Sequence, residues 1–598
     1  MVTRNLDIAL RHLRHPTLVL PIWIDAICID QQNMAERSQQ VAFMCELYRK
    51  AGETYVWIGP EENYSNDVMD WIDLIGLISE VNWSTETMYN SKDYKNVGRK
   101  NADIFDVSLT WETDWFVTLR SICHLANRDY FTRLWVRQEV KMSQCKWLVC
   151  GNQRVPWQPF SNFARWMAVK PLIVQDPYAN WTEQLDKRYK AGASMILSLC
   201  KGALELTVTT FDRLRFDNTN LQWKDPRDAI YANLGMLAPE CRQLGIVPDY
   251  DKDPADIFTD VAVRVATKLH SLGFLESCDI DSIDLENLPT WVPDWSSPLK
   301  IDPGMENIWS SSAWISAQVE YLGDGVMVAN GVAVSEVESV HYWEGDRPYE
   351  GQPYMVCDCI RYWCDLKPSD YDEHQESYLE GSNLTWLEAW CTLFLYGNLI
   401  DVFKAGQESE VDRPDLMSLQ EAKEMFLIIL RARSFHEIWC LDDPMWRRMD
   451  RFLSKIGNRM KGRVVFKTVN GHIGVAPASI WRGSMVSVLL DERERWQVFS
   501  SCFVVGLMDG EAITGPLPKN CRTVDWRFRE DLSSDHKINR LQSGIFNEQE
   551  GTLETDPAKV LQDRGIPCIR YERQPHLLEV SPEALRNAGV ELRRFVLV

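Results

Sequence analysis

The stretch Trp23-Ile-Asp-Ala-Ile-Cys-Ile-Asp30-Gln31, together with Tyr55-Val-Trp-Ile-Gly59, decides the fold that we expect for the N-terminal part of the chain. Residues 22–29 form a nearly unbroken apolar run of strand length, which is typical of a strand covered on both faces. Asn33-Met-Ala-Glu36 has the form of a helix start, with a capping side chain and a carboxylate three residues later. Residues 54–58 are a second apolar run. The pattern therefore predicts a strand, a helix and a strand.

A helix between two strands implies that the strands are parallel and lie in a buried sheet. In such sheets ligands bind beyond the carboxyl ends of the strands. Asp30 and Gln31 follow the first predicted strand, Gly59 follows the second, and Arg37 lies near the start of the helix. We expect these residues at the ligand face, where Arg37 can meet a pyrophosphate. The structural alternative is a helix cap with an exposed ion pair.

Length and composition exclude several classes of protein. A chain of 598 residues is too long for one core and predicts two to four domains. A net charge of −22 disfavours nucleic acid and anionic membranes as general partners. No apolar run reaches the ~20 residues of a membrane helix. Sixteen scattered cysteines and no signal-peptide pattern predict a cytoplasmic protein with reduced thiols.

The opening stretch, with Glu36-Arg37, Gln40-Val41 and Trp57-Ile-Gly59, resembles the fungal heterokaryon incompatibility (HET) domain in order and spacing. This resemblance implies a role in self/non-self recognition and regulated cell death. It implies protein partners, either a second copy or an incompatibility partner. HET domains in turn resemble Toll/interleukin-1-receptor (TIR) domains, some of which cleave NAD. NAD is then a candidate substrate, and no other cofactor or metal is expected.

The resemblance continues downstream. Asp225-Pro-Arg-Asp228, Pro248-Asp-Tyr250 and the segment 288–295 (Leu-Pro-Thr-Trp-Val-Pro-Asp-Trp) are similar to segments of the same family. The first of these also predicts a helix that runs to Gly235. Residues 254–271 predict a long amphipathic helix, and residues 326–334 predict two strands around a turn.

The expected fold is an α/β N-terminal domain with a TIR- or flavodoxin-like parallel sheet, then a mainly helical region, then an α+β region with a small β-rich module. Family members begin with a strand ending in Ser-Tyr-x-Trp-Gly, for which this chain has no counterpart. The resemblance therefore implies an N-terminally truncated domain that lacks its first strand. We predict six segments: 1–160 (HET domain), 161–300 (helical extension), 301–350 (β-hairpin), 351–460 (helical), 461–515 (β-rich) and 516–598 (tail).

Glu139 is the candidate catalytic residue. It lies four residues after Trp135 in a segment where Thr132 is a plausible cap, so both side chains share one helical face. NAD-cleaving TIR domains carry a glutamate in a Trp-x-x-x-Glu helix, and the match falls on Trp135 and Glu139. A single carboxylate can suffice, because cationic nicotinamide is already a good leaving group. The structural alternative is a surface glutamate paired with Arg137 or Lys141.

The resemblance makes Asp25, Asp30, Arg37 and Trp135 candidates for nucleotide binding. Asp25 interrupts the first predicted strand, where a carboxylate needs a hydrogen bond or a charged partner. It can orient a ribose, or it can play the favoured structural role of pairing with Arg133 or Arg37.

The cysteines give weaker signals. Cys28 has apolar neighbours and no histidine tied to it by a motif, so a buried core thiol is favoured over a nucleophile. Cys357, Cys359 and Cys364 fit no standard zinc spacing and are expected in a helical core. Three functions remain open: an NAD-cleaving enzyme, a non-enzymatic recognition or signalling module, which includes a degenerate family member, and a distant thiol hydrolase.

Overall fold

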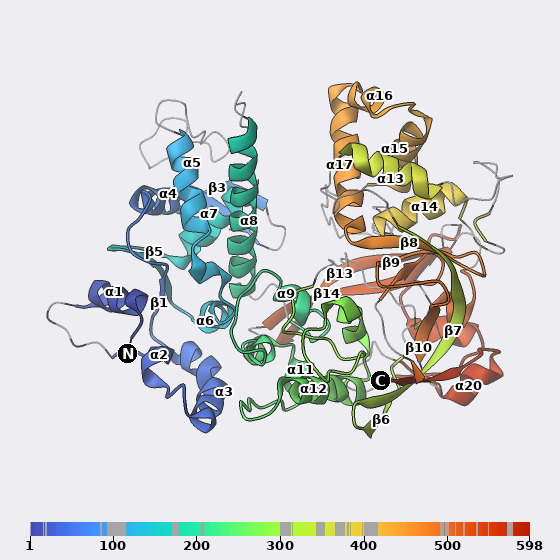
Figure 1. Ribbon diagram of the computed structural model, residues 1–598, viewed down its shortest axis with the longest axis horizontal. Coiled ribbons are helices and arrows are strands. Elements are labelled where there is room, and N and C mark those ends of the chain that lie inside the picture. Colours follow the sequence, from blue (N-terminus) through green and yellow to red (C-terminus); the bar gives the residue numbers. More distant parts are fainter. Residues whose placement is uncertain are drawn as a thin grey trace. The chain divides into compact units, whose positions relative to one another are not determined.

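The computed structural model in Figure 1 divides the chain into two compact units. The first comprises Met1–Thr210, Asn218–Asp253 and Glu530–Asn539, and the second comprises Phe211–Asp217, Pro254–Arg529 and Arg540–Val598. The structure describes residues 2–15, 17, 19, 21–83, 87–91, 115–169, 179–204, 209–299, 312–313, 315–342, 353–364, 377–379, 382, 384–397, 399, 417–490, 495–496, 501–508, 510–517, 521–533, 536–547, 549–570 and 578–598.

A small mixed sheet lies in the first unit. Its strand order is β1-β4-β5, formed by Thr54–Trp57, Lys146–Cys150 and Gln153–Pro156. β1 and β4 are parallel, whereas β4 and β5 form an antiparallel hairpin. Gly151 makes the hairpin turn with a φ of +56°, a conformation that glycine adopts without a steric penalty. The strand predicted at 54–58 is thus present as β1.

The strand predicted over residues 22–29 is wrong. Asp25–Cys28 instead form a short helix, α2, closed by hydrogen bonds from the N–H groups of Ile27 and Cys28 to the carbonyl of Ile24. Ile27 is 52% exposed, so the apolar run is not covered on both faces as a buried strand requires. Periodicity alone does not separate a short buried strand from other apolar segments.

The helix predicted to start at Asn33 is confirmed. The Asn33 side chain accepts a hydrogen bond from the backbone N–H of Glu36, and α3 then runs over Met34–Lys50. The helix expected from Thr132 begins later. Asp129–Thr132 form a 3-10 turn, η2, and α6 spans Val136–Met142 with Trp135 at its N-cap.

Four helices build the core of the first unit beside the sheet (Figure 1). They are α4 (Ser65–Ile78), α5 (Trp115–Ala126), α7 (Trp157–Val169) and α8 (Ala179–Ala203). Gly76 allows α4 and α7 to approach closely, because a Cβ there would lie 2.2 Å from the Cβ of Pro159. The other elements of this unit are α1 (Arg4–Leu13), β2 (Ser79–Asn82), β3 (Thr87–Asn90), α10 (Asp228–Tyr231), η3 (Leu234–Met236) and α11 (Pro239–Arg242). The helix predicted to start at Asp225-Pro-Arg-Asp228 and to run to Gly235 is therefore split into α10 and η3.

The second unit begins with a helical segment and continues into a larger, mostly antiparallel sheet. The predicted amphipathic helix is confirmed as α12, Pro254–Lys268. The sheet runs β11-β18-β7-β8-β9-β12, with β6 and β10 also paired to β7. Among its described strand pairs, only β11 and β18 run parallel. Four helices, α13, α14, α15 and α17, form a separate apolar cluster that also includes residues of β8 and β9.

The turn predicted within residues 326–334 is wrong. β7 is one continuous strand, Val326–His341, and the hairpin turn lies before it at Asp324 and Gly325. Both turn residues have positive φ, at 49° and 73°, as the tightest hairpin turns require.

The remaining elements of the second unit are short or lie in the sheet and cluster named above. They are α9 (Leu214–Asp217), η4 (Gly273–Ser277), η5 (Ile280–Ser282), β6 (Glu320–Gly323), α13 (Pro353–Cys364), α14 (Trp386–Leu395), α15 (Leu419–Arg431), α16 (Phe435–Trp439), α17 (Asp443–Met460), β8 (Arg463–Thr468), β9 (Ile473–Pro477), β10 (Met485–Leu490), β11 (Arg495–Trp496), β12 (Phe503–Val504), α18 (Glu511–Thr514), β15 (Thr552–Glu554), α19 (Pro557–Asp563), β16 (Ile569–Arg570), β17 (Leu578–Glu579), α20 (Pro582–Asn587) and β18 (Arg593–Leu597). β13 (Cys521–Ser533) and β14 (His536–Asn547) each contribute residues to both units.

The observed architecture is therefore a small mixed sheet with helices, a helical middle region and a C-terminal region built on an antiparallel sheet. The exact limits of the six predicted segments stay a prediction. In the part of the chain that the structure describes, no helix has both the length and the apolar composition that crossing a membrane demands.

Candidate functional site

Glu139 lies in the first turn of α6 and is half-buried. Its Oε2 accepts a hydrogen bond from the phenol of Tyr130 at 3.1 Å. Burial raises the pKa of Glu139, and the charge of Asp25 raises it further. Arg133 and the Tyr130 hydrogen bond act in the opposite direction and lower it. Glu139 thus occupies a site of partly buried charge, which is unlike the surface glutamate of the structural alternative.

Tyr48 of α3 is the second aromatic group of this site. Burial and the charges of Glu139 and Asp25 raise its pKa well above the usual value for tyrosine. Its ring lies 5.8 Å from the ring of Trp23 in an edge-to-face arrangement. Glu139, Asp25, Tyr48 and Tyr130 thus form one group of interacting side chains, which we call the carboxylate site.

The structure brings the candidate binding residues to different places. Asp25 lies in α2, and its Oδ1 accepts a hydrogen bond from the N–H of Ala26 at 2.7 Å. Asp30 is exposed, and its Oδ1 accepts from the N–H of Gln32 at 3.0 Å. The side chains of Arg37 and Trp135 instead meet at Asp228, a residue that the sequence had marked only as a helix start.

Arg37 is held by two carboxylates. Its Nη1 lies 3.2 Å from Oδ2 of Asp225, and its Nη2 lies 3.4 Å from Oδ1 of Asp228. The guanidinium also lies over the ring of Tyr250, with Cζ 3.7 Å from the ring centre. The ion pairs expected for Arg37 thus involve Asp225 and Asp228. The exposed ion pair of the structural alternative does not apply, because the three side chains are largely buried.

Gly59 and Gln31 lie elsewhere in this unit. A Cβ at Gly59 would lie 3.1 Å from Nη1 of Arg128, whose guanidinium donates to the carbonyl of Ile58. Gln31 donates through its side chain to the carbonyl of Asp25 at 3.3 Å. Both residues thus have local structural contacts.

The expectation that Cys28 is a buried core thiol is wrong, because Cys28 is exposed. Its apolar neighbours belong to the short helix α2 and not to a buried strand, which removes the cover that the sequence implied. Cys357, Cys359 and Cys364 are buried in α13, as expected. Over the described residues, no group of three or more histidine, cysteine or acidic side chains could hold a metal ion.

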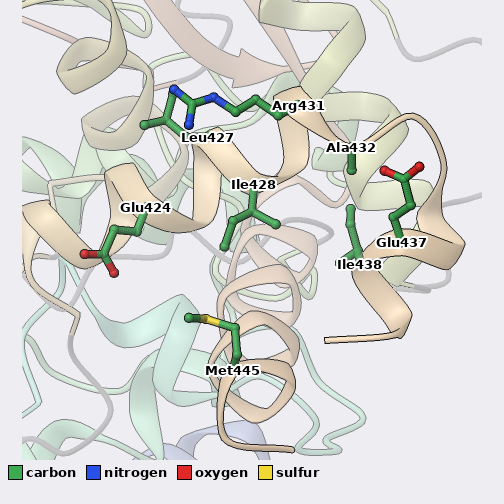
Figure 2. A pocket seen from close by; sticks show the side chains of 8 residues that line it. All are labelled: Glu424, Leu427, Ile428, Arg431, Ala432, Glu437, Ile438 and Met445. Atoms are coloured by element: carbon green, nitrogen blue, oxygen red, sulfur yellow. The ribbon is translucent and has the colours of Figure 1, made fainter. Parts of the chain in front are cut away.

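A cavity of about 520 Å³ lies in the second unit, lined by α15, α16 and the start of α17. Figure 2 shows the side chains that line it. Apolar side chains form most of its wall, and charged groups of α15 and α16 join them. The lining residues are Glu424, Leu427, Ile428, Arg431, Ala432, Glu437, Ile438 and Met445. None of the predicted site residues contributes to this cavity.

Comparison with known proteins identifies the N-terminal part of the chain. Residues 1–139 match the family described as heterokaryon incompatibility protein (HET). The chain thus contains a HET domain over these residues. The matched segment of the HET domain ends at Glu139, so it contains the carboxylate site, but it leaves Asp225, Asp228 and Tyr250 outside.

One curated relative of this chain is heterokaryon incompatibility protein 6, OR allele, of Neurospora crassa. The two sequences are 26% identical over 351 residues, which covers 49% of this chain and 48% of the relative. The chain thus spans about half the length of the curated relative that it matches. No solved structure shows a significant match.

Proposed function

We propose that this HET-domain protein acts in fungal self/non-self recognition and regulated cell death, and that its N-terminal unit does so by cleaving NAD at Glu139. The observation that carries the proposal is the environment of this carboxylate. It is half-buried, it accepts a hydrogen bond from Tyr130, and its charge interacts with Asp25. Perturbed ionisable groups of this kind cluster at functional sites.

The proposed reaction is hydrolysis of the bond between nicotinamide N1 and ribose C1′. The bonding electron pair leaves with nicotinamide, which becomes neutral. The ribose carbon gains positive charge, and the Glu139 carboxylate stabilises it in the transition state. The oxygen of a water molecule then bonds to C1′ and one proton is released, so the products are nicotinamide, ADP-ribose and a proton.

The carboxylate site suits a cationic substrate. Asp25 and Glu139 supply negative charge, and the adjacent rings of Trp23 and Tyr48 offer faces that attract a cation. The nicotinamide ring of NAD carries such a charge. Asp30 is exposed and can contact a ribose hydroxyl, whereas Arg37 reaches a pyrophosphate only when its ion pairs to Asp225 and Asp228 open.

A TIR-like arrangement of the first unit is part of the proposal. The parallel pair β1 and β4 supports it. A cytoplasmic location is proposed as well, because no two cysteines form a disulfide within the part of the chain that the structure describes, as a reducing compartment favours.

The test is release of nicotinamide from NAD by the purified full chain. We expect turnover by the wild-type protein and none by the Glu139→Gln variant, which keeps the shape of the side chain and removes its charge. Glu80→Gln, at an exposed position on β2, is the matched control and should keep full activity. Absence of turnover at high protein concentration, or full activity of the Glu139→Gln protein, would contradict the proposal.

A second candidate function is recognition through protein contacts without catalysis. Exposed apolar side chains on α2 and α3 favour this function, because such side chains mark surfaces that bind other proteins. Ile27 is 52% exposed and Phe43 is 57% exposed. A second copy of the chain or an incompatibility partner would cover them. In this case Phe43→Asp should abolish cell death in the fungus, while Glu139→Gln should leave it intact. The opposite pattern supports the enzyme.

A further inference from the structure

The carboxylate of Asp228 joins three segments that are far apart in the sequence. It is 5% exposed and accepts a hydrogen bond from the phenol of Tyr250 at 2.5 Å. Arg37 of α3 lies 3.4 Å away. Burial raises the pKa of Asp228, whereas the Tyr250 hydrogen bond, the charge of Arg37 and a hydrogen bond from Trp135 lower it. A buried carboxylate needs such partners, and each donor is thereby fixed in position.

Asp225 and Tyr250 complete this network. Asp225 pairs with Arg37 at 3.2 Å and with Arg227 at 2.8 Å. The Tyr250 ring lies against the Arg37 guanidinium, and the Tyr250 N–H donates to the hydroxyl of Ser38 at 3.0 Å. Residues 225–250 are thus anchored to the first turns of α3.

Gly235 provides a second contact of the same segment. A Cβ at this position would lie 1.8 Å from Sγ of Cys45 on α3, so the backbone and the helix are in close contact. The side chain of Gln138 on α6 donates to the same sulfur. Residues 225–250 therefore contact both α3 and α6.

Trp135 links this segment to the carboxylate site. It is the N-cap residue of α6 and makes no side-chain capping bond of its own. The N–H of Glu139 donates to the carbonyl of Trp135 at 3.2 Å, so the two residues are one helical turn apart. The backbone of Trp135 therefore forms part of the helical turn that carries Glu139.

We infer that residues 225–250 are a clamp that positions Trp135 and Glu139, so that the working unit of the HET domain extends beyond residue 139 to Tyr250. Asp228 and Tyr250 are positioning residues in this view. The inference adds to the proposed function and rests on it only in naming Glu139 as the reacting group. On this inference, the Asp-Pro-Arg-Asp and Pro-Asp-Tyr segments serve to position Trp135 and Glu139.

The test compares two tyrosines of the same segment. Tyr250→Phe removes the hydroxyl that donates to Asp228 and keeps the ring against Arg37. Tyr231→Phe is the matched control, because the Tyr231 hydroxyl contacts the backbone of Asp249, as donor at 3.1 Å and as acceptor at 3.0 Å. Both changes remove one hydroxyl that is involved in hydrogen bonds, so both lower stability.

The readout is the proton affinity of Glu139 in the full chain. The difference in unfolding free energy between proteins with Glu139 and with Glu139→Gln, followed against pH, gives this affinity without any need for turnover. We expect Tyr250→Phe to change the proton affinity about tenfold, the equivalent of one charge-assisted hydrogen bond, while Tyr231→Phe leaves it unchanged. Asp228→Asn, which keeps an acceptor for Trp135, should give a smaller change than Asp228→Ala.

Equal proton affinities in the Tyr250→Phe and Tyr231→Phe backgrounds would overturn the clamp. Failure of the wild-type chain to cleave NAD would overturn the proposed function alone, because the measurement on Glu139 does not depend on catalysis.

Discussion

The phenol of Tyr130 lies 3.1 Å from Oε2 of Glu139, and both side chains belong to a short segment before and within α6. The hydrogen bond stabilises the charged form of Glu139, whereas burial and the charge of Asp25 favour the neutral form. The balance of these effects sets the pH range in which the Glu139 carboxylate is ionised.

The first prediction concerns the acidic limb of the pH–activity profile for NAD cleavage, where activity rises with pH. The proposed reaction needs Glu139 ionised, so activity should rise with pH through the pKa of this group. Tyr130→Phe and Arg133→Gln each remove an influence that lowers the pKa, so both should move the limb to higher pH. Asp25→Asn removes an influence that raises the pKa and should move the limb to lower pH. The pH profile of nicotinamide release measures all three.

The control for this series is Asp7→Asn, at an exposed carboxylate of α1 that pairs with Arg11. Its profile should coincide with that of the wild type. Shifts of the Tyr130→Phe and Asp25→Asn profiles in the same direction would contradict the assignment of the limb to Glu139.

The second prediction concerns Arg37 and the stability of the first unit. Arg37→Ala leaves the largely buried carboxylates of Asp225 and Asp228 without their shared cation, which typically costs about 3 kcal/mol. Thermal or urea unfolding measures the loss. Arg11→Ala is a fitting comparison, because Arg11 belongs to an exposed pair and should change stability little. An equally mild effect of both substitutions would show that the ion pairs of Arg37 do not stabilise the first unit.

The site itself could be predicted from the sequence only in part. The spacing of Trp135 and Glu139 placed both on α6, and the structure keeps them one turn apart. No local pattern reveals that Asp228 contacts Trp135 and Arg37, since these residues are separated by about 90 and 190 positions. Such pairings depend on the tertiary fold, and a helix-capping motif gives no information about them.

The fold shows the same limit. The Asn33 cap is a local interaction and was predicted correctly. The run around Asp25 has the composition of a buried strand, but Ile27 and Cys28 are exposed and the chain makes a helical turn there. Whether an apolar run becomes a strand depends on a partner strand, and β1 pairs with β4 instead.

The third prediction concerns pH and Asp212 in the second unit. The Oδ1 atom of Asp212 is buried and has no hydrogen-bond partner among the residues that the structure describes. Burial raises the pKa of Asp212 to about 6. The folded state then holds its proton more tightly than the unfolded state, so this residue should cost stability as pH rises from about 4 to 6, and the cost should stay constant above that range.

Asp212→Asn removes this cost. We expect the variant to match the wild type near pH 4 and to be more stable by about 3 kcal/mol at pH 8. Asp260→Asn, at a partly exposed ion pair on α12, should not give this pH dependence. A constant difference in unfolding free energy across the whole pH range would show that Asp212 is not the titrating group.

The last prediction concerns Gly331, which lies in the segment 326–334 where the sequence predicted a turn. The structure gives a different reason for glycine. Gly331 lies within β7, where it pairs with Leu489 of β10 and with Arg593 of β18. A Cβ there would lie 2.6 Å from the carbonyl oxygen of Val488 and 2.6 Å from the ring of Phe595. Because a backbone atom cannot move aside as a flexible side chain can, Gly331→Ala should destabilise the second unit by about 2 kcal/mol.

Gly483→Ala is the matched control for this change. Gly483 has a φ of +89° but open space around its Cβ direction, so alanine there meets only backbone strain of about 1 kcal/mol. Unfolding of the full chain, followed by a probe in the β7 sheet, separates the two effects. If Gly331→Ala proved harmless while Gly483→Ala did not, the close approach of the three strands at Gly331 would be refuted.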